Sequence, residues 1–343
     1  MAKTKKILIV TKDLGEYNTL SPIARQLEQS GQVVSVVAEE LSHVKWFKEG
    51  RWLNDENAVS PEALLKSFNP QAVICGLGSP INLGEKYGLA SNNMGIPLVH
   101  VHDIWGVHCR STAIPDLVLA PDPFAEKLVK EYAPYAGKPP KVVVTGFPAM
   151  DNLKEVGENI TVAKKIGQST AILVLGQDES TTPMLHGMAE AVKRLDDVVI
   201  IPRLHPKIKE GRAEWLEILA SMEADVLWVH SNVPTRQLMF YSHITVSIYS
   251  TGLVEAAMLG SVPASWTSEI GRQMMSKNLG GIERFPLVNY ECAYEVSEPE
   301  GFLRIISEYP SEYGKWQKAV KHHLPNDGKA AERCANTILE FIS

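Results

Sequence analysis

The chain lacks the features that mark several large protein classes. Its four cysteines, Cys75, Cys109, Cys292 and Cys334, are far apart and form no CxxC pair, which argues against a disulfide framework and a structural zinc site. No apolar run approaches the roughly 18 residues of a membrane span. Acidic residues outnumber Lys and Arg, and the net charge of −6 argues against a general nucleic-acid binder, which must neutralise phosphates.

What the chain does have is length and a globular composition. Its 343 residues exceed one ordinary core and predict two domains, and 45% hydrophobic with 22% charged residues is typical of a soluble protein. The apolar run in the basic start MAKTKKILIV is too short for a secretory signal. We therefore expect a first buried strand there, and a cytoplasmic protein in a reducing compartment.

Short β-branched runs alternate with helical patterns throughout, which is typical of parallel α/β units. The polar segment DNLKEVGENITVAKKIGQST separates two such halves. We predict two doubly wound Rossmann-like domains, at 1–155 and 156–325, followed by a C-terminal helix at 326–343. The predicted strands are 6–10, 32–38, 72–76, 97–102, 117–121 and 141–146 in the first half, and 171–176, 198–203, 225–230, 244–249 and 262–266 in the second.

Open parallel sheets bind ligands where strands lead into helices, and SIYSTGLVEAAMLGSVP is such a place. Unpaired N–H groups at the helix start attract anions, and the small residues Ser250, Thr251 and Gly252 would let a phosphate approach. Glu255, expected in the first turn of this helix, could accept hydrogen bonds from ribose hydroxyls. An ordinary N-cap, with a glutamate stabilising the helix dipole, explains the same residues.

Basic residues alternate after the apolar run VVII. In PRLHPK, Arg203, His205 and Lys207 share one face at a period of two, which suits a diphosphate. A solvated basic edge is the alternative, but the buried character of VVII favours a functional role. GQDES ends the first strand of the second half and places Gly176 and Gln177 at the same edge.

The segment HVHDIWGVH gathers His100, His102, Asp103 and His108 after a predicted strand. An imidazole beside a carboxylate can act as a general base near neutral pH. Histidines hydrogen-bonded in the core are the alternative interpretation. The spacing does not match a known metal site, so we expect no bound metal.

The loop TKDLGEYNTLSP after the first strand carries two further carboxylates. Asp13 and Glu16 would lie at the mouth of the N-terminal sheet, where either could deprotonate an attacking hydroxyl. Acidic residues are also ordinary at the start of a helix, which is the alternative.

Aromatic and basic residues are mixed in HVKWFKEGRWL, which contains Trp46, Phe47 and Trp52. Such a segment can settle on a membrane surface or grip a lipid-linked acceptor. A helix that packs its aromatic side chains inward is the alternative. The sequence leaves open both this peripheral contact and an oligomer.

In order, these segments resemble those of GT-B glycosyltransferases and of their relatives, the non-hydrolysing UDP-N-acetylglucosamine 2-epimerases. GIPLVHVHD is similar to the family's GIPVxHVEAG, DLVLAPDPFAEKLV to DLxFAPTxxAxxNL, and VVVTGFPAMD to VTGNPVxD. In the second half, PRLHPK is similar to PxHP, STGLVEAAMLGSVP to SGGxxEEAxxLGxP, and NDGKAAERCAN to GDGxAxERI. The resemblance covers most of the chain.

The resemblance implies two Rossmann-like domains facing across a cleft, with the last helix crossing back to the N-terminal domain. It implies a donor site in which the helix start binds phosphates, the helix glutamate binds ribose and the loop HSNVPT contacts the base. The residues in these roles are Ser250, Thr251 and Gly252 for phosphate, Glu255 for ribose, and Val233 and Pro234 for the base, with His205 also in the donor site.

Three departures from the epimerase pattern argue against epimerisation. His102 replaces the Glu of HVEAG, GQDESTT replaces HRREN, and TSEIG replaces TERPE. Ser247 stands where many retaining transferases carry a partner for the helix glutamate, which favours an inverting mechanism.

The prediction is therefore an inverting, metal-independent and cofactor-free glycosyltransferase that uses a nucleotide sugar, with a UDP-sugar favoured. Asp13, Glu16, His102 and Asp103 are the candidate bases. The acceptor is unidentified, with a lipid-linked molecule or a glycan as candidates. A divergent epimerase and a non-catalytic nucleotide-binding protein are the alternatives.

Overall fold

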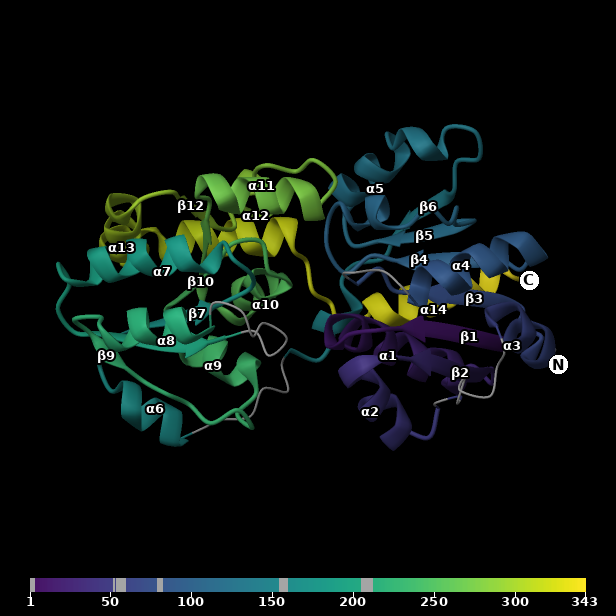
Figure 1. Cartoon of the computed structure of the whole chain (residues 1–343), viewed down its shortest axis with the longest axis horizontal. Helices are drawn as coiled ribbons and strands as arrows, with labels where there is room; N and C mark the ends of the chain where they lie inside the picture. Colours follow the sequence, from purple (N-terminus) through teal and green to yellow (C-terminus); the bar gives the residue numbers. More distant parts are fainter. Residues whose placement is uncertain (1–3, 52, 54–59, 79–82, 154–159, 205–211) are drawn as a thin grey trace. The chain divides into compact units, whose positions relative to one another are not determined.

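The computed structural model describes residues 4–51, 53, 60–78, 83–153, 160–204 and 212–343 (Figure 1). They fall into two compact units. Unit 1 comprises Met1–Asp151, Asn278–Gly280 and Asn326–Ser343, and unit 2 comprises Asn152–Lys277 and Gly281–Pro325.

Unit 1 is built on a six-stranded parallel sheet with the order β2-β1-β3-β4-β5-β6. The chain moves from β1 outward to β2, then returns to the other side of β1 and continues through β3 to β6. The order therefore reverses between β1 and β3. The strands are β1 (Lys6–Thr11), β2 (Val33–Ala38), β3 (Ala72–Cys75), β4 (Leu98–Val101), β5 (Leu117–Ala120) and β6 (Lys141–Val144).

Helices cover both faces of this sheet, and the interior positions of its central strands are buried on either face. In β1, Ile7 and Ile9 face the core shared with α1 and α14, while Leu8 and Val10 face the core shared with α3 and α4. The helical segments are α1 (Leu14–Gln29), α2 (Glu40–Lys48), α3 (Pro61–Phe68), α4 (Leu83–Met94), α5 (Pro123–Lys130), α14 (Ala330–Phe341) and the 3-10 turns η1 (Val107–Arg110), η2 (Ala133–Tyr135) and η3 (Pro148–Met150).

The C-terminal helix α14 belongs to unit 1 and lies beside α1, although the two helices come from opposite ends of the chain (Figure 1). Ile338 is fully buried in the same core as Ile23 of α1. The start of α14 is held by Asp151, whose carboxylate accepts hydrogen bonds from the N–H groups of Ala330 at 3.0 Å and Ala331 at 2.8 Å. These bonds satisfy two of the unpaired donors at the helix start.

Unit 2 repeats the design with a parallel sheet in the order β12-β11-β10-β7-β8-β9, which reverses between β7 and β10. Its strands are β7 (Thr170–Leu175), β8 (Val198–Arg203), β9 (Asp225–Val226), β10 (Ile244–Ser247), β11 (Val262–Trp266) and β12 (Tyr294–Val296). Its helices are α6 (Ile160–Ile166), α7 (Thr181–Val192), α8 (Arg212–Ala220), α9 (Thr235–Tyr241), α10 (Thr251–Leu259), α11 (Glu269–Asn278), α12 (Pro286–Asn289) and α13 (Pro299–His323).

The predicted doubly wound architecture is confirmed, with two differences in the strands. The strand predicted at 225–230 ends at Val226. The next hydrogen bond between β8 and β9 would need an N–H from Pro202 of β8, and proline has none to donate. The backbone of Ile200 faces β9 and accepts from the N–H of Leu227 at 2.8 Å, so Pro202 is the next residue on that side. The short edge strand β12 was not predicted at all.

The membrane contact that the sequence left open does not hold for Trp46, which follows the inward-packing alternative. Its side chain is fully buried in the unit 1 core and packs edge-on against Tyr17, with ring centroids 5.1 Å apart. Phe47 is 62% exposed, and Trp52 lies outside the described residues. In the part of the chain that the structure describes, no helix has the length and apolar character to cross a bilayer.

Replacing Asp151 by Ala should destabilise unit 1 by about 1–2 kcal/mol, since two helix-start donors lose their partner. Asp151→Asn keeps one acceptor oxygen, so its stability should lie between those of the unaltered protein and Asp151→Ala. Urea unfolding and amide exchange within α14 would measure this. Asp327→Ala is the control, because its carboxylate makes an exposed ion pair with Arg333 and one hydrogen bond with the N–H of Lys329, before α14 begins. Equal losses in the Asp151 and Asp327 variants would contradict this role.

Candidate active site

Each sheet has one place where adjacent strands send their connections to opposite faces, and such places form the ligand crevices of open parallel sheets. In unit 1 it lies between β1 and β3, and in unit 2 between β10 and β7. The predicted residues after β1, β7 and β10 stand beside these two points.

In unit 2, the side chain of Gln177 joins the loop after β7 to the loop after β10. Its Oε1 accepts hydrogen bonds from the N–H of Tyr249 at 3.0 Å, the N–H of Ile248 at 3.3 Å and the hydroxyl of Ser247 at 3.0 Å. The Tyr249 hydroxyl in turn donates to Asp178. Two loops are thereby tied together directly before α10.

The start of α10 combines both interpretations that the sequence allowed. Ser250 is an N-cap whose hydroxyl oxygen accepts from the N–H of Gly252 at 3.1 Å. A Cβ on Gly252 would lie 2.6 Å from the side chain of Leu175, so the small size of this residue permits close helix-to-sheet packing. The structure gives no partner to the N–H and hydroxyl of Thr251 among the described residues. These groups remain available to an anion.

Glu255 is the fifth residue of α10, which begins at Thr251, so it lies beyond the first turn where the sequence placed it. Its Oε2 accepts a hydrogen bond from Nε of Arg236 in α9 at 2.6 Å. Its Oε1 has no hydrogen-bond partner in the described ranges. One carboxylate oxygen is thus held by Arg236, and the other meets no donor among the described residues.

Arg203 is predicted to bind a diphosphate, but in the structure it braces a loop. Its guanidinium donates to the carbonyls of Val233 at 2.7 Å and Ser231 at 3.0 Å, and to the hydroxyl of Thr235 at 3.3 Å. Burial lowers the pKa of this guanidinium. Arg203 therefore shapes the loop that carries Val233 and Pro234 into α9.

Three other residues predicted for the nucleotide-sugar site provide no side chain, among the described residues, that could bind phosphate. His205 and Lys207 lie outside the described residues. Gly176 is buried, and a Cβ there would lie 3.3 Å from Leu204 and 3.5 Å from Trp215. These distances are close to ordinary contact, so packing makes only a weak demand for glycine at this position.

In unit 1, the buried carboxylate of Glu16 bridges the switch point between β1 and β3. It accepts hydrogen bonds from the N–H groups of Lys12, of Asp13 at 3.2 Å, and of Gly78 in the loop after β3. A Cβ on Gly76 would lie 2.7 Å from Glu16, so this loop can approach the carboxylate only because it is built from glycine. Burial, reinforced by Asp13, raises the pKa of Glu16 to about 7.

Asp13 and Asp103 lie close to each other and to α1. Asp13 is the N-cap of α1 and accepts from the N–H of Glu16 at 3.0 Å, which matches the helix-entry alternative. A Cβ on Gly15 would lie 3.3 Å from Asp13 and 3.5 Å from Asp103. Burial, with a smaller contribution from Asp13, raises the pKa of Asp103 to about 6, and the guanidinium of Arg110 opposes this rise. A carboxyl group with this pKa can exchange a proton near neutral pH.

The predicted histidine base is disfavoured by its surroundings. His100 and His102 are 0% and 1% exposed, and their ring nitrogens have no hydrogen-bond partner in the part of the chain that is described. Burial lowers the pKa of His100 and His108 to about 4 and that of His102 well below its usual value. A neutral imidazole with such a low pKa is a weak base. In the described ranges, no group of three or more His, Cys, Asp or Glu side chains is placed to hold a metal ion.

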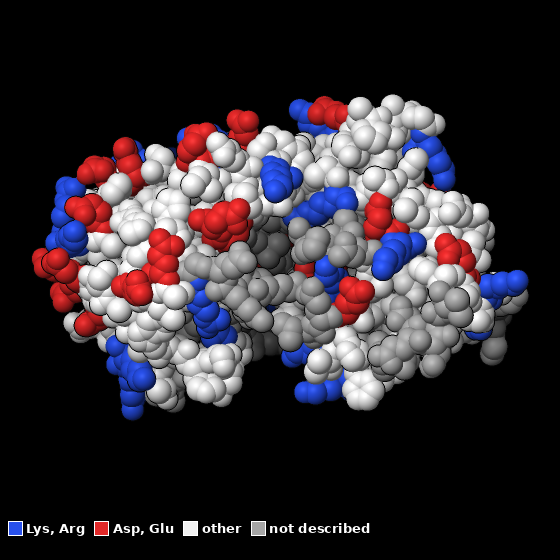
Figure 2. Space-filling model, viewed as in Figure 1, with Lys and Arg blue, Asp and Glu red and all other residues white. Residues whose placement is uncertain are grey.

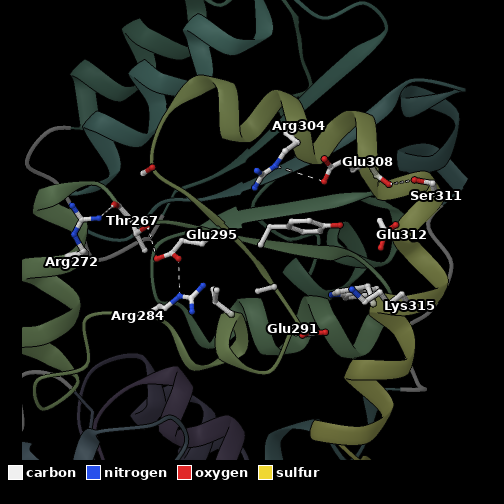
Figure 3. Close-up of a pocket in the computed structure, with 15 residues that line it drawn as sticks. Thr267, Arg272, Arg284, Glu291, Glu295, Arg304, Glu308, Ser311, Glu312 and Lys315 are labelled. Carbon is white, nitrogen blue, oxygen red and sulfur yellow. Dashed lines mark hydrogen bonds and ion pairs between the residues drawn. The ribbon is translucent and has the colours of Figure 1, made fainter.

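A further hollow of about 930 Å³ lies beside the edge strand β12 and one face of α13 (Figure 3). Its charges are mixed: Nε of Arg284 bonds Glu295 at 2.9 Å, and Arg304 lies 3.9 Å from Glu308. Such exposed pairs stabilise little. On the face in Figure 2, the described basic and acidic residues are likewise interspersed. The hollow is two strands from the switch point, so we do not assign the active site to it.

Sequence reasoning missed several residues that build the two sites. CGLG after the strand at 72–76 was a readable signal, because glycines at a strand end permit close approach. Asp178 adjoins Gln177 in the quoted GQDES. Tyr249, Arg236 and Arg110 carried no signal, because their roles depend on partners distant in sequence.

Solved structures match the chain over nearly its whole length, whereas no protein-family model and no curated protein sequence matches it. S. aureus MnaA with UDP is 16% identical, with 99% of this chain and 97% of that one covered and a TM-score of 0.76. The Neisseria meningitidis UDP-GlcNAc 2-epimerase bound to UDP-GlcNAc is 17% identical, with 98% and 100% covered and a TM-score of 0.70. Anabaena Alr3699/HepE in complex with UDP and glucose is 13% identical, with 98% and 100% covered and a TM-score of 0.66. The predicted GT-B fold is confirmed.

The buried histidines predict a loss of stability in acid. Because burial lowers the pKa of His100 from 6.5 to about 4, the unfolded chain binds more protons in this window, and stability falls as pH falls through it. His100→Leu should remove about 3 kcal/mol of this pH dependence. Urea unfolding at pH 7 and pH 4 would measure it. Glu16, whose raised pKa acts oppositely between 4.5 and about 7, is present in both proteins. If the stability of the unaltered protein and of His100→Leu changes equally between pH 7 and pH 4, the low pKa assigned to His100 is refuted.

Proposed function

We propose that the protein is a glycosyltransferase that uses a nucleotide sugar, with a UDP-sugar favoured. The observation that carries the proposal is the arrangement before α10, where Gln177 ties two loops together. Beside it, the N–H and hydroxyl of Thr251 and Oε1 of Glu255 have no partner among the described residues. It offers donors for a diphosphate and an acceptor for ribose at the switch point of one sheet. UDP is favoured because S. aureus MnaA and Anabaena HepE were solved with it.

In this proposal unit 2 binds the donor. The start of α10 and the Thr251 hydroxyl would offset the negative charge that grows on the diphosphate as the glycosidic bond breaks. Glu255 would accept hydrogen bonds from the ribose hydroxyls through its free oxygen. The loop held by Arg203, with Val233 and Pro234, would lie against the base.

Unit 1 would supply the base, and Asp103 is our preferred candidate. Its raised pKa suits proton transfer, whereas the Glu16 carboxylate is occupied by backbone donors and Asp13 caps α1. Asp103 would take the proton of the acceptor hydroxyl as its oxygen attacks the anomeric carbon. The nucleoside diphosphate would leave from the opposite face with the bonding electrons, and this single displacement would invert the configuration at the anomeric carbon.

A divergent epimerase is the second candidate, favoured by the likeness to the Neisseria meningitidis UDP-GlcNAc 2-epimerase, with a TM-score of 0.70. An epimerase that removes and returns the C2 proton would incorporate deuterium at C2 of UDP-GlcNAc in D2O without any acceptor. Incorporation that disappears in Asp103→Asn would replace the transferase proposal. No deuterium incorporation, together with UDP release when an acceptor is added, would support the transferase proposal.

UDP should raise the melting temperature of the protein and bind measurably in calorimetry, because a ligand of the folded state stabilises it. Glu255→Gln should weaken UDP binding about tenfold, since a charged hydrogen-bond acceptor is lost. Glu269→Gln, an exposed carboxylate at the start of α11, is the control and should bind UDP normally. If neither UDP nor other nucleoside diphosphates stabilise the protein, the donor site is misassigned.

Asp103→Asn should reduce donor turnover by about 10²–10⁴-fold and leave the Kd for UDP within about twofold, because a general base acts on the chemical step. In the unaltered protein, kcat/KM should fall as pH is lowered below about 6, where Asp103 takes up a proton. Stopped assays of UDP release from the donor sugar would report both. Turnover that survives in Asp103→Asn would move the base to another residue.

A further inference from the structure

Arg236 of α9 and Glu255 of α10 form a close ion pair, and Glu255 is the proposed ribose-binding residue. Nε of Arg236 lies 2.6 Å from Oε2 of Glu255, and the two side chains are only 27% and 15% exposed. A partly sheltered pair with a short N–O distance is stronger than the median surface pair. The bond thus has the strength to restrain a side chain.

The pair fixes one end of a carboxylate and leaves the other end open. A glutamate has three side-chain torsions, and holding it in one orientation before a ligand arrives reduces the entropy that binding must overcome. The bond to Arg236 uses Oε2, while Oε1 has no partner among the described residues and retains two lone pairs. Two lone pairs on one oxygen match the two hydroxyls of a ribose diol.

We propose that Arg236 is the positioning residue that orients Glu255 toward a 2′,3′-diol, and that the pair thereby selects ribonucleotide donors. The inference rests on the proposed function, because it assumes a nucleotide in this site. Arg236 acts through Glu255 and contacts neither phosphate nor sugar. The ligand class is a nucleoside diphosphate with both ribose hydroxyls free.

The chain offers a matched control in the pair Arg284–Glu295, beside the hollow in Figure 3. It has the same Nε–Oε2 geometry at 2.9 Å and lies in the same unit, but its side chains are 53% and 33% exposed. It lies near the edge strand β12, two strands from β10. Removing its arginine deletes an equivalent charge without touching the proposed site.

The test compares UDP with 2′,3′-dideoxy-UDP by titration calorimetry on the full chain. The unaltered protein should bind UDP about tenfold more tightly than the dideoxy analogue. Arg236→Met should weaken UDP binding about tenfold and change dideoxy-UDP binding less than twofold. Arg236→Lys should lie between, and Arg284→Met should leave both affinities unchanged. In a Glu255→Gln background, Arg236→Met should have no further effect.

The outcomes separate the inference from the function on which it rests. If Arg236→Met weakens both ligands equally, or neither, the positioning role is overturned while the donor site stands. If Arg236→Met fails to fold, the comparison of the two ligands on the unaltered protein and on Arg236→Lys decides. Equal affinity for both ligands in those proteins overturns the diol selection. If UDP does not bind the unaltered protein, the proposed function fails and the inference fails with it.

Discussion

The candidate site of unit 2 depends on one side chain, Gln177, which spans the gap where neighbouring strands send their chains to opposite faces. Its Oε1 satisfies backbone donors of the loop after β10 that would otherwise point into this gap unpaired. Without that acceptor the loop before α10 would lose the bonds that define its path. The position of Thr251 at the helix start and of Glu255 one turn later follows from this restraint.

Unit 1 solves the same problem with a carboxylate. Glu16 accepts from the N–H groups at the end of β1 and from Gly78 after β3, so it ties the same two kinds of loop as Gln177 does. A neutral amide suits a site proposed to bind a diphosphate, whereas a carboxylate there would repel it. In unit 1 the buried carboxylate instead contributes to a local acidic environment, in which Asp13 helps to raise the pKa of Asp103.

Two arginines beside the proposed donor site make their hydrogen bonds to the protein itself. Arg203 donates to a loop, and Arg236 donates to Glu255. These cations therefore shape the surfaces around α9 and α10. In the proposed function, the described groups that would offset phosphate charge are those at the start of α10. Helix-start amides are rigid and need no reorganisation when charge develops, which is the property that a leaving diphosphate requires.

Hydrophobic pattern and turn residues in the sequence were enough to predict two doubly wound sheets and to place the candidate residues at strand ends, because burial on both faces of a parallel sheet leaves a local record in each strand. Only the tertiary structure decided which of those residues are already used. Gln177 and Tyr249 are 72 residues apart, and Glu16 and Gly78 are 62 apart. No local pattern records such pairs, so the sequence alone could not show that Arg203 holds a loop or that Gly252 serves packing. Nor could it show that the buried ring of His102 has no hydrogen-bond partner among the described residues. The sequence determines the chemical groups at each strand end. Whether a group can reach a ligand is decided by neighbours distant in sequence, which only folding brings beside it.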